Sequence, residues 1–283
     1  MKNSLYFVSK TSNFGDAINP FIFNKVLGLN FSVAKEHNSN IFGIGSILQK
    51  AFIYNKNNNI LGNIWRNKKK YLNYYSNKEK NLFVFGSGFI DDCLGNLIEY
   101  KKIKYLAIRG RKSLSIVESL HGKLNYDPVM GDPGLLVERL IEKPKKKKYE
   151  VGFIPHYIDQ NTLSAKLILK NKKIKYINIL DTPLNVLNQI ADCEIIISSA
   201  LHGLIAADSL NIPNKWIKLS NNLMGNDFKF NDYYSVFNLS LSPWDLSCIN
   251  NFKIDKNKIF DSYCIDQSEV EKIKRSLIDI AKK

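Results

Sequence analysis

The chain has 283 residues, 45% of them hydrophobic, so it can bury a large core in one or two domains. Its formal net charge of +15 favours anionic partners such as phosphorylated ligands, an acidic membrane surface or nucleic acid. No RNP, zinc-finger or helix-turn-helix pattern is present, so we do not expect nucleic acid as a partner. No stretch approaches the ~18 apolar residues that span a bilayer, and no secretory signal precedes the first predicted strand. We therefore expect a cytoplasmic protein. Its four cysteines form no CxxC pair, so we expect no metal site.

Short apolar runs alternate with helical patterns along the chain, which indicates an α/β fold with parallel sheets. The predicted elements of the first half are strands over 4–9, 82–85 and 105–108 and a helix over 111–120. A proline inside a lysine run at 142–149 predicts an exposed linker. The predicted elements of the second half are strands over 150–154, 174–179, 194–197 and 215–218, and a closing helix after a capping box at 266–269.

The segment Asn13-Phe14-Gly15-Asp16 follows the first predicted strand. After it, Asn19 and Pro20 predict the start of a helix, with Asn19 as the cap. A carboxylate repels phosphate, so we expect Asp16 to face a cleft away from any phosphate, as a hydroxyl-orienting group or general base. The alternative is a turn aspartate that caps the helix.

Two glycine-rich segments, 43–46 and 86–88, end predicted strands, and either can admit a ligand or form a tight turn. Neither is a dinucleotide fingerprint, and no P-loop is present. Arg109 ends another apolar strand, where a guanidinium suits a planar carboxylate or a phosphate. The alternative is an arginine paired with a neighbouring acid.

The segment from Ser198 to Asp208 follows a buried strand and opens an Ala- and Leu-rich helix. Such a turn lies at the carboxyl end of a sheet, where helix N–H groups bind anions. His202 at this point can bind a phosphate or move a proton. At the end of strand 150–154, His156 and Asp159 should face the same cleft, although a hydrogen-bonded structural histidine is the alternative.

The stretch from Lys56 to Lys80 mixes basic and aromatic residues, among them Trp65, Arg66 and Tyr71. This composition suits an anionic membrane surface or a lipid diphosphate. A solvated loop and helix face explains it equally well.

The segment Ser-Ser-x-Leu-His-Gly-Leu-Ile at 198–205 resembles the signature of polysaccharide pyruvyl transferases. Further segments resemble the family in the same order, over roughly residues 5–237. They lie at 13–16, 86–88, 109–110, 131–136, 152–157 and 225–234. The resemblance implies a GT-B-like fold of two Rossmann-like domains, 1–145 on the acceptor side and 146–283 on the donor side, with a closing C-terminal helix. Their parallel sheets would face an interdomain cleft.

The resemblance also implies a reaction. The chain would transfer pyruvate from phosphoenolpyruvate to a hexose of a bacterial surface polysaccharide or its lipid-linked repeat unit, forming a ketal without a metal or cofactor. The implied catalytic residues are His202, His156 and Asp16. The implied donor-binding residues are Arg109, Ser198, Ser199, Leu201, Gly203 and Lys215. The implied acceptor-binding residues are Asn13, Gly15, Gly86, Ser87 and Asp159.

The chain departs from the family in two places. A branch of the family has arginine where this chain has Ala200, and Arg111-Lys112-Ser113 replaces Pro-x-Thr after Arg-Gly. Arg109, Arg111 or Lys215 could supply the missing charge. Two alternatives stay open: a GT-B glycosyltransferase, which would release a nucleotide, and a non-catalytic basic scaffold.

Overall fold

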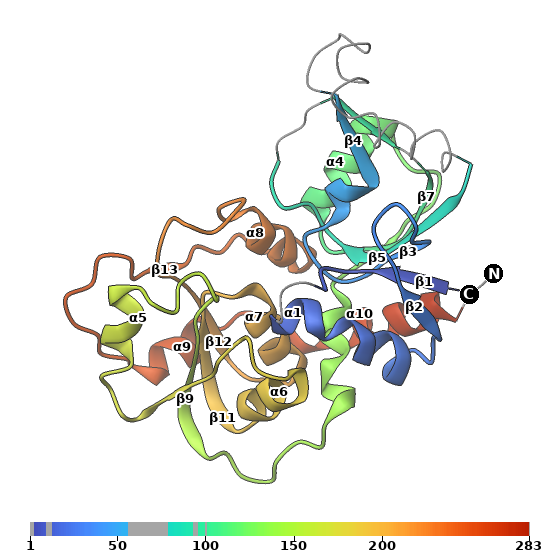
Figure 1. Ribbon diagram of the computed structural model, residues 1–283. Helices are drawn as coiled ribbons and strands as arrows, with labels where there is room; N and C mark the ends of the chain where they lie inside the picture. Colours follow the sequence, from blue (N-terminus) through green and yellow to red (C-terminus); the bar gives the residue numbers. More distant parts are fainter. Residues whose placement is uncertain (1–2, 10–12, 56–78, 93–95, 100, 283) are drawn as a thin grey trace.

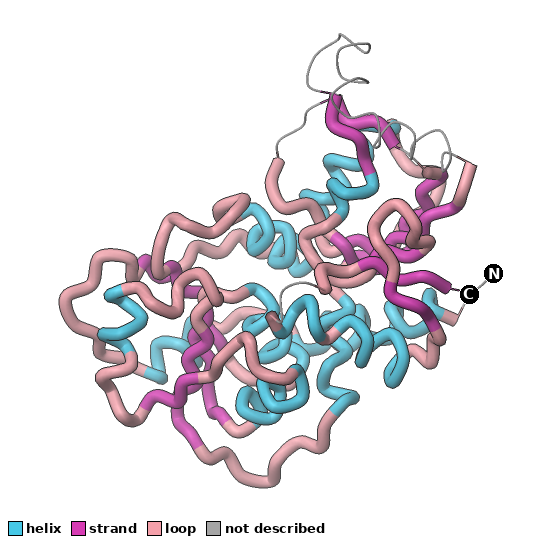
Figure 2. The backbone as a smooth tube through the Cα atoms, in the orientation of Figure 1, coloured by secondary structure: helices cyan, strands magenta, loops and turns pink. Residues whose placement is uncertain are grey.

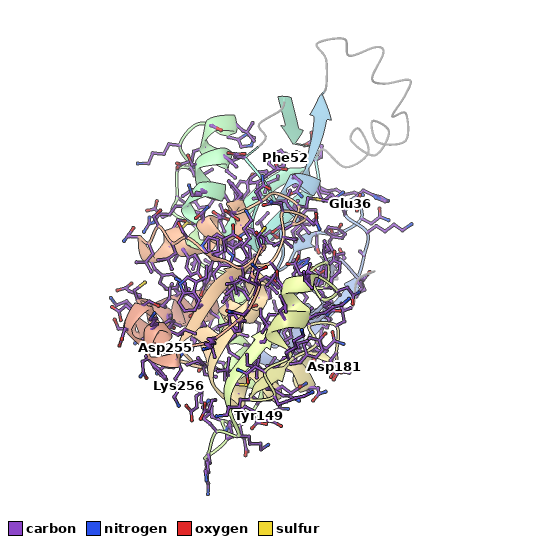
Figure 3. The ribbon with its side chains drawn as sticks, turned by 90° about the vertical axis from the view of Figure 1, so that its left-hand side faces the viewer. Glu36, Phe52, Tyr149, Asp181, Asp255 and Lys256 are labelled. Carbon is purple, nitrogen blue, oxygen red and sulfur yellow. The ribbon has the colours of Figure 1, made fainter. Side chains whose placement is uncertain are left out.

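The structure of the protein is a computed structural model that describes residues 3–9, 13–55, 79–92, 96–99 and 101–282. Two parallel sheets lie at opposite ends of the molecule, with helices packed between them (Figures 1 and 2). We call residues 3–140, which carry the first sheet, the first half, and residues 149–282 the second half. Figure 3 shows the side chains that fill both, with Phe52 in the first half and Tyr149 and Asp255 in the second.

The first sheet has six parallel strands in the order β2-β1-β3-β5-β7-β8. The strands are β1 (Asn3–Tyr6), β2 (Phe31–Val33), β3 (Ile41–Phe42), β5 (Asn81–Ser87), β7 (Lys102–Ile108) and β8 (Val129–Met130). The strand order reverses between β1 and β3, which makes the carboxyl ends of these two strands a switch point where ligands bind. A separate antiparallel pair joins β4 (Phe52–Asn55) to β6 (Asn96–Glu99).

The second sheet has five parallel strands in the order β10-β9-β11-β12-β13. The strands are β9 (Tyr149–Ile154), β10 (Ile174–Tyr176), β11 (Cys193–Ser198), β12 (Asn214–Lys218) and β13 (Trp244–Asp245). The central strand β11 is a nearly continuous apolar run because helices cover both of its faces. Here the order reverses between β9 and β11, so the second switch point lies at the ends of these strands.

The helices connect the strands, with α1 and α7 in the middle of the molecule and α5 at the outer edge of the second half (Figure 1). The α-helices are α1 (Phe14–Ala17), α4 (Arg111–His121), α5 (Leu163–Ile168), α6 (Pro183–Ala191), α7 (Leu201–Ser209), α8 (Phe228–Tyr234), α9 (Lys256–Ser262) and α10 (Gln267–Ala281). The tighter or wider turns are the π-helix η1 (Phe21–Val26) and the 3₁₀ segments η2 (Leu48–Ala51), η3 (Pro133–Leu140) and η4 (Ser235–Phe237).

Two late helices cross to the first half. In α8, Phe230 stacks on Trp216 of β12 with ring centroids 4.3 Å apart, while Asp232 accepts hydrogen bonds from the backbone and hydroxyl of Ser113 in α4. The closing helix α10 contacts β7 and β8 of the first sheet. One hydrophobic cluster therefore runs from Leu5 in β1 to Leu277 in α10.

The sequence predicts the α/β class, the two parallel sheets and the GT-B-like arrangement, and the structure confirms them. Asp266 caps the closing helix by accepting from the Ser268 N–H, as predicted. Residues 142–148 of the expected linker lie between η3 and β9, and Tyr149 already begins β9. The domain boundary at residue 145 stays a prediction. Most of the basic stretch from 56 to 80 lies outside the described residues.

The predicted cap of the first helix is wrong. The helix begins earlier, at Phe14, and Asn13 caps it by accepting from the Asp16 N–H. Asn19 is fully buried instead. Its side chain donates to the carbonyl of Ile44 and accepts from the Ile44 N–H, so it ties the helix to the turn after β3. Satisfying a buried amide on both sides outweighs its use as a cap.

Candidate active site

A cavity of about 220 Å³ lies between the two halves. Its walls come from the carboxyl ends of β1 and β3 in the first sheet and of β9 and β11 in the second. The lining residues are Val8, Asn13, Asp16, Gly45, Ser46, Ile47 and Ile90 from the first half and His156, Tyr157, Ile179, Ala200, Leu201, His202 and Lys229 from the second. Both switch points therefore open onto one space, as expected for a ligand site in paired α/β sheets.

His202 occupies the first turn of α7, directly after the turn that ends β11. Its Nε2 lies 3.6 Å from Oδ2 of Asp132, a fully buried carboxylate. Among the described residues, neither atom has a hydrogen-bond partner. The other carboxylate oxygen, Oδ1, accepts from the Gly134 N–H at 2.8 Å and so fixes Asp132 at the start of η3. Asp132 can therefore orient the imidazole and stabilise positive charge on it.

Gly15 makes room for the His202 ring. A Cβ atom at position 15 would lie 2.0 Å from His202 Nδ1, well inside van der Waals contact. Gly15 is buried in α1 and does not line the cavity. The structure thus places it as a packing partner of His202, while its expected contact with the acceptor stays a prediction.

His156 follows β9 and lines the cavity opposite α1. Its Nδ1 accepts from the Ile158 N–H at 3.3 Å, and its ring lies 4.4 Å from that of Tyr157. Burial, with the nearby charges of Lys229 and His202, lowers the pKa of His156 to about 3. The ring is therefore neutral at pH 7 and can donate a hydrogen bond from Nε2, but it is poorly suited to act as a general acid.

Asp16 and Asn13 line the first-half wall of the cavity. The Asn13 amide both caps α1 and donates to Oδ2 of Asp16. The carboxylate is therefore held in place at the cavity wall, where it can accept a hydrogen bond from a ligand.

Three predicted contact residues are buried behind the cavity wall. Ser199 Oγ donates to Asp159 Oδ2 at 2.9 Å, and Ser220 Oγ donates to Asp159 Oδ1 at 2.6 Å. Ser198 Oγ donates to the carbonyl of Ile154 at 2.9 Å. These hydroxyls and this carboxylate shape the loop that carries His156, and the structure does not bring them to the cavity surface.

Arg109 is fully buried and does not line the cavity. Its Nε donates to Asp232 Oδ2 at 2.9 Å, its Nη2 to the carbonyl of Phe89 at 2.6 Å, and its Nη1 to Ser46 Oγ at 2.6 Å. The geometry matches the alternative of an arginine paired with an acid. These bonds tie Arg109 to α8 and to Ser46, and its expected contact with the donor stays a prediction.

The remaining predicted residues have other surroundings. Lys215 lies over the Trp244 ring, 5.2 Å from its centroid, in a separate hollow. Ser87 Oγ donates to the Gly43 carbonyl, Gly86 packs on Pro133, and Gly203 packs on Ser198. Leu201 does line the cavity.

Sequence reasoning missed three residues of the site: Asp132, Ser46 and Lys229. Each lies in a segment that the motifs had marked, at 131–136, 43–46 and 225–234. The motifs alone did not predict a role for any of the three, because the residues around them in the fold come from distant segments.

The described residues contain no group of three or more His, Cys, Asp or Glu side chains placed to hold a metal ion. In the same part of the chain, no helix is long and apolar enough to cross a membrane.

Comparison with known proteins supports the resemblance seen in the motifs. Residues 100–221 match the family model of polysaccharide pyruvyl transferase, the family that those motifs resemble. This range holds Asp132, His156 and His202, whereas Asp16 and Lys229 lie outside it.

Two curated relatives extend the similarity. The uncharacterized protein L143 of Acanthamoeba polyphaga mimivirus is 29% identical over 215 residues, which cover 72% of each chain. The succinoglycan biosynthesis protein ExoV of Rhizobium meliloti is 24% identical over 241 residues, which cover 84% of this chain and 66% of ExoV. A solved structure of an uncharacterized protein from Klebsiella pneumoniae is 12% identical, covers 82% of this chain and 87% of its own, and has a TM-score of 0.47.

Proposed function

We propose that this chain transfers pyruvate from phosphoenolpyruvate to two hydroxyls of a hexose in an exopolysaccharide, forming a ketal and releasing inorganic phosphate. The observation that carries the proposal is His202, held beside the buried carboxylate of Asp132 at a cavity that both sheets build. The family match and the similarity to a succinoglycan biosynthesis protein support a polysaccharide acceptor.

The chemistry needs one acid and one base. A proton added to C3 of the enol makes C2 electrophilic, and a first sugar oxygen bonds to C2 as its proton leaves. The C2–O bond to phosphate then breaks, and a second sugar oxygen bonds to C2 as its proton leaves. One of the two hydroxyl protons replaces the proton that the acid gave to C3, and the other leaves on the phosphate. The products are the cyclic ketal and inorganic phosphate.

The cavity residues divide into these roles. His202 is the proposed acid, because Asp132 can stabilise its protonated form and α7 begins at the same point. Asp16 is the proposed base on the acceptor side, where Asn13 holds its carboxylate. His156 is neutral and is proposed to donate a hydrogen bond to the acceptor.

The proposal also includes attachment of the protein to an anionic membrane surface. The net charge of +15 supports a lipid-linked acceptor at the cytoplasmic face of an anionic membrane. Co-sedimentation with anionic vesicles should then fall as salt rises, because salt screens exposed charges. Equal pelleting with neutral and anionic vesicles would contradict the electrostatic attachment.

Ligand-induced stabilisation tests the donor. Phosphoenolpyruvate should raise the melting temperature, since a ligand bound only by the folded state stabilises it. Sugar nucleotides should raise it less. Stabilisation by a sugar nucleotide alone would instead support a glycosyltransferase on the same fold.

A further inference from the structure

The proposed mechanism leaves one charged cavity residue without a task. Lys229, in α8, is the only lysine or arginine among the described residues that line the cavity. It shares that lining with His156, His202 and Asp16. An anionic substrate in the cavity would therefore meet this ammonium.

Lys229 is half-buried, and no carboxylate of the described residues pairs with its ammonium. Among the described residues, its Nζ makes no ion pair or hydrogen bond, and it lies 5.5 Å from the centroid of the Phe230 ring. Burial and the positive charge of Arg109 lower the pKa of Lys229 to about 8, while Asp159 and Asp16 act in the opposite direction. Desolvation of the ammonium is thus incompletely offset, and an anion bound in the cavity would offset it.

The backbone that carries Lys229 is fixed from both halves. Asp232, one turn later in α8, pairs with Arg109 and accepts from Ser113, and Phe230 stacks on Trp216. Gly110 is packed so closely against α8 that a Cβ there would lie 1.8 Å from the Asp232 carbonyl oxygen. The backbone at Lys229 is therefore fixed beside the cavity, which places its side chain in the cavity lining.

We propose that Lys229 forms the anion-binding subsite of the cavity and takes the phosphate or carboxylate group of the donor. The identity of the donor rests on the proposed function. The affinity of the subsite for a simple oxyanion does not depend on that function. Lys229 also gives the cavity a positive charge that Ala200 lacks. Arg109 and Lys215 do not line the cavity and so do not place their charges there.

Calorimetric titration of the full chain at pH 7 with phosphoenolpyruvate, inorganic phosphate and pyruvate tests this subsite. Lys229→Met should weaken binding of phosphoenolpyruvate by about 10- to 100-fold, the range of a hydrogen bond to a charged group. Lys229→Arg should retain most of the affinity. Lys170→Met, a change at an exposed lysine, is the matched control and should bind as the wild type does.

The two small anions identify the end of the donor that Lys229 holds. Loss of phosphate binding alone assigns the phosphate, and loss of pyruvate binding alone assigns the carboxylate. Wild-type affinity in Lys229→Met, or no binding of any of the three anions by the wild-type protein, would overturn the subsite. Phosphate binding that depends on Lys229 without any binding of phosphoenolpyruvate would keep the subsite and overturn the proposed donor.

Two readouts separate this role from a structural one. Lys229→Met should melt at or above the wild-type temperature, because it removes an unpaired ammonium from a desolvated site. The affinity of the wild type for phosphoenolpyruvate should fall above pH 8, because the Lys229 ammonium then loses its proton. The other charged or titratable groups that act on this ammonium, or on which it acts, are Arg109, Asp16, Asp159 and His156. Lys229→Arg should remove that fall. A large loss of stability with unchanged affinity would instead assign Lys229 to the fold.

Discussion

Nε2 of His202 and Oδ2 of Asp132 face each other at 3.6 Å, and both atoms are buried without a hydrogen-bond partner among the described residues. The histidine lies in the first turn of α7 in the second half, and the aspartate caps η3 at the end of the first. The pair therefore joins the two halves at the cavity.

Asp132→Asn should lower turnover by about 10- to 100-fold, the range for losing a bond to a charged group, with little effect on donor affinity. The asparagine keeps Oδ1 as the acceptor for the Gly134 N–H, so the start of η3 should survive. Steady-state kinetics and calorimetry on the same sample measure the two effects. Unchanged turnover would show that Asp132 does not act through His202.

Gly15→Ala should both destabilise the protein, by roughly 1–3 kcal/mol for overpacking, and lower turnover, because the new methyl group displaces the His202 ring. Gly28→Ala is the matched control. A Cβ at Gly28 meets no atom within 4 Å, but its positive φ of 68° makes the substitution strained. Both variants should melt lower, and only Gly15→Ala should lose turnover. Equal turnover in both would refute the role of Gly15 as space for His202.

Arg109→Met and Asp232→Asn should each cost about 3–5 kcal/mol of unfolding free energy, because each leaves the other group buried and uncompensated. The double variant Arg109→Met with Asp232→Leu should be less destabilised than the sum of its single changes. Urea unfolding of the set gives the coupling between the residues. If Arg109→Met instead kept its stability and lost only donor affinity, Arg109 would be the anion clamp that the motif first indicated.

Asp208 predicts a pH dependence of stability. It accepts from the hydroxyls of Tyr233 and Tyr263 and from Asn214, and burial raises its pKa from 3.8 to about 6. The folded state therefore holds the proton more tightly than the unfolded state, so this stabilisation is complete below pH 4 and is lost as pH rises toward 6.

The measurement is urea unfolding of the wild type and of Asp208→Asn across that range. The unfolding free energy of the wild type should fall relative to the variant by at most about 1.4 kcal/mol per pH unit. Parallel stability curves for the two proteins would show that Asp208 ionises normally in the fold.

Much of this arrangement follows from local sequence. The apolar run of β11 and the Ala-rich helix after it place His202 at a carboxyl edge, and the same logic places His156 and Asp16. Partners far apart in the chain do not follow in this way. Arg109 and Asp232 are 123 positions apart, and nothing in either segment indicates their ion pair. For the same reason, the sequence shows neither the burial of Asp132 behind His202 nor the position of Lys229 at the cavity.

The central claim is tested most directly by following phosphate release and ketal formation together, with phosphoenolpyruvate and a model galactoside as substrates. Wild-type protein should release one phosphate for each pyruvate ketal, detected by the new ketal methyl signal in NMR. His202→Gln should fold normally and lose about 10²–10⁴-fold in rate, the usual contribution of a general acid. Full activity in His202→Gln, or nucleotide release from a sugar nucleotide with no phosphate from phosphoenolpyruvate, would contradict the account.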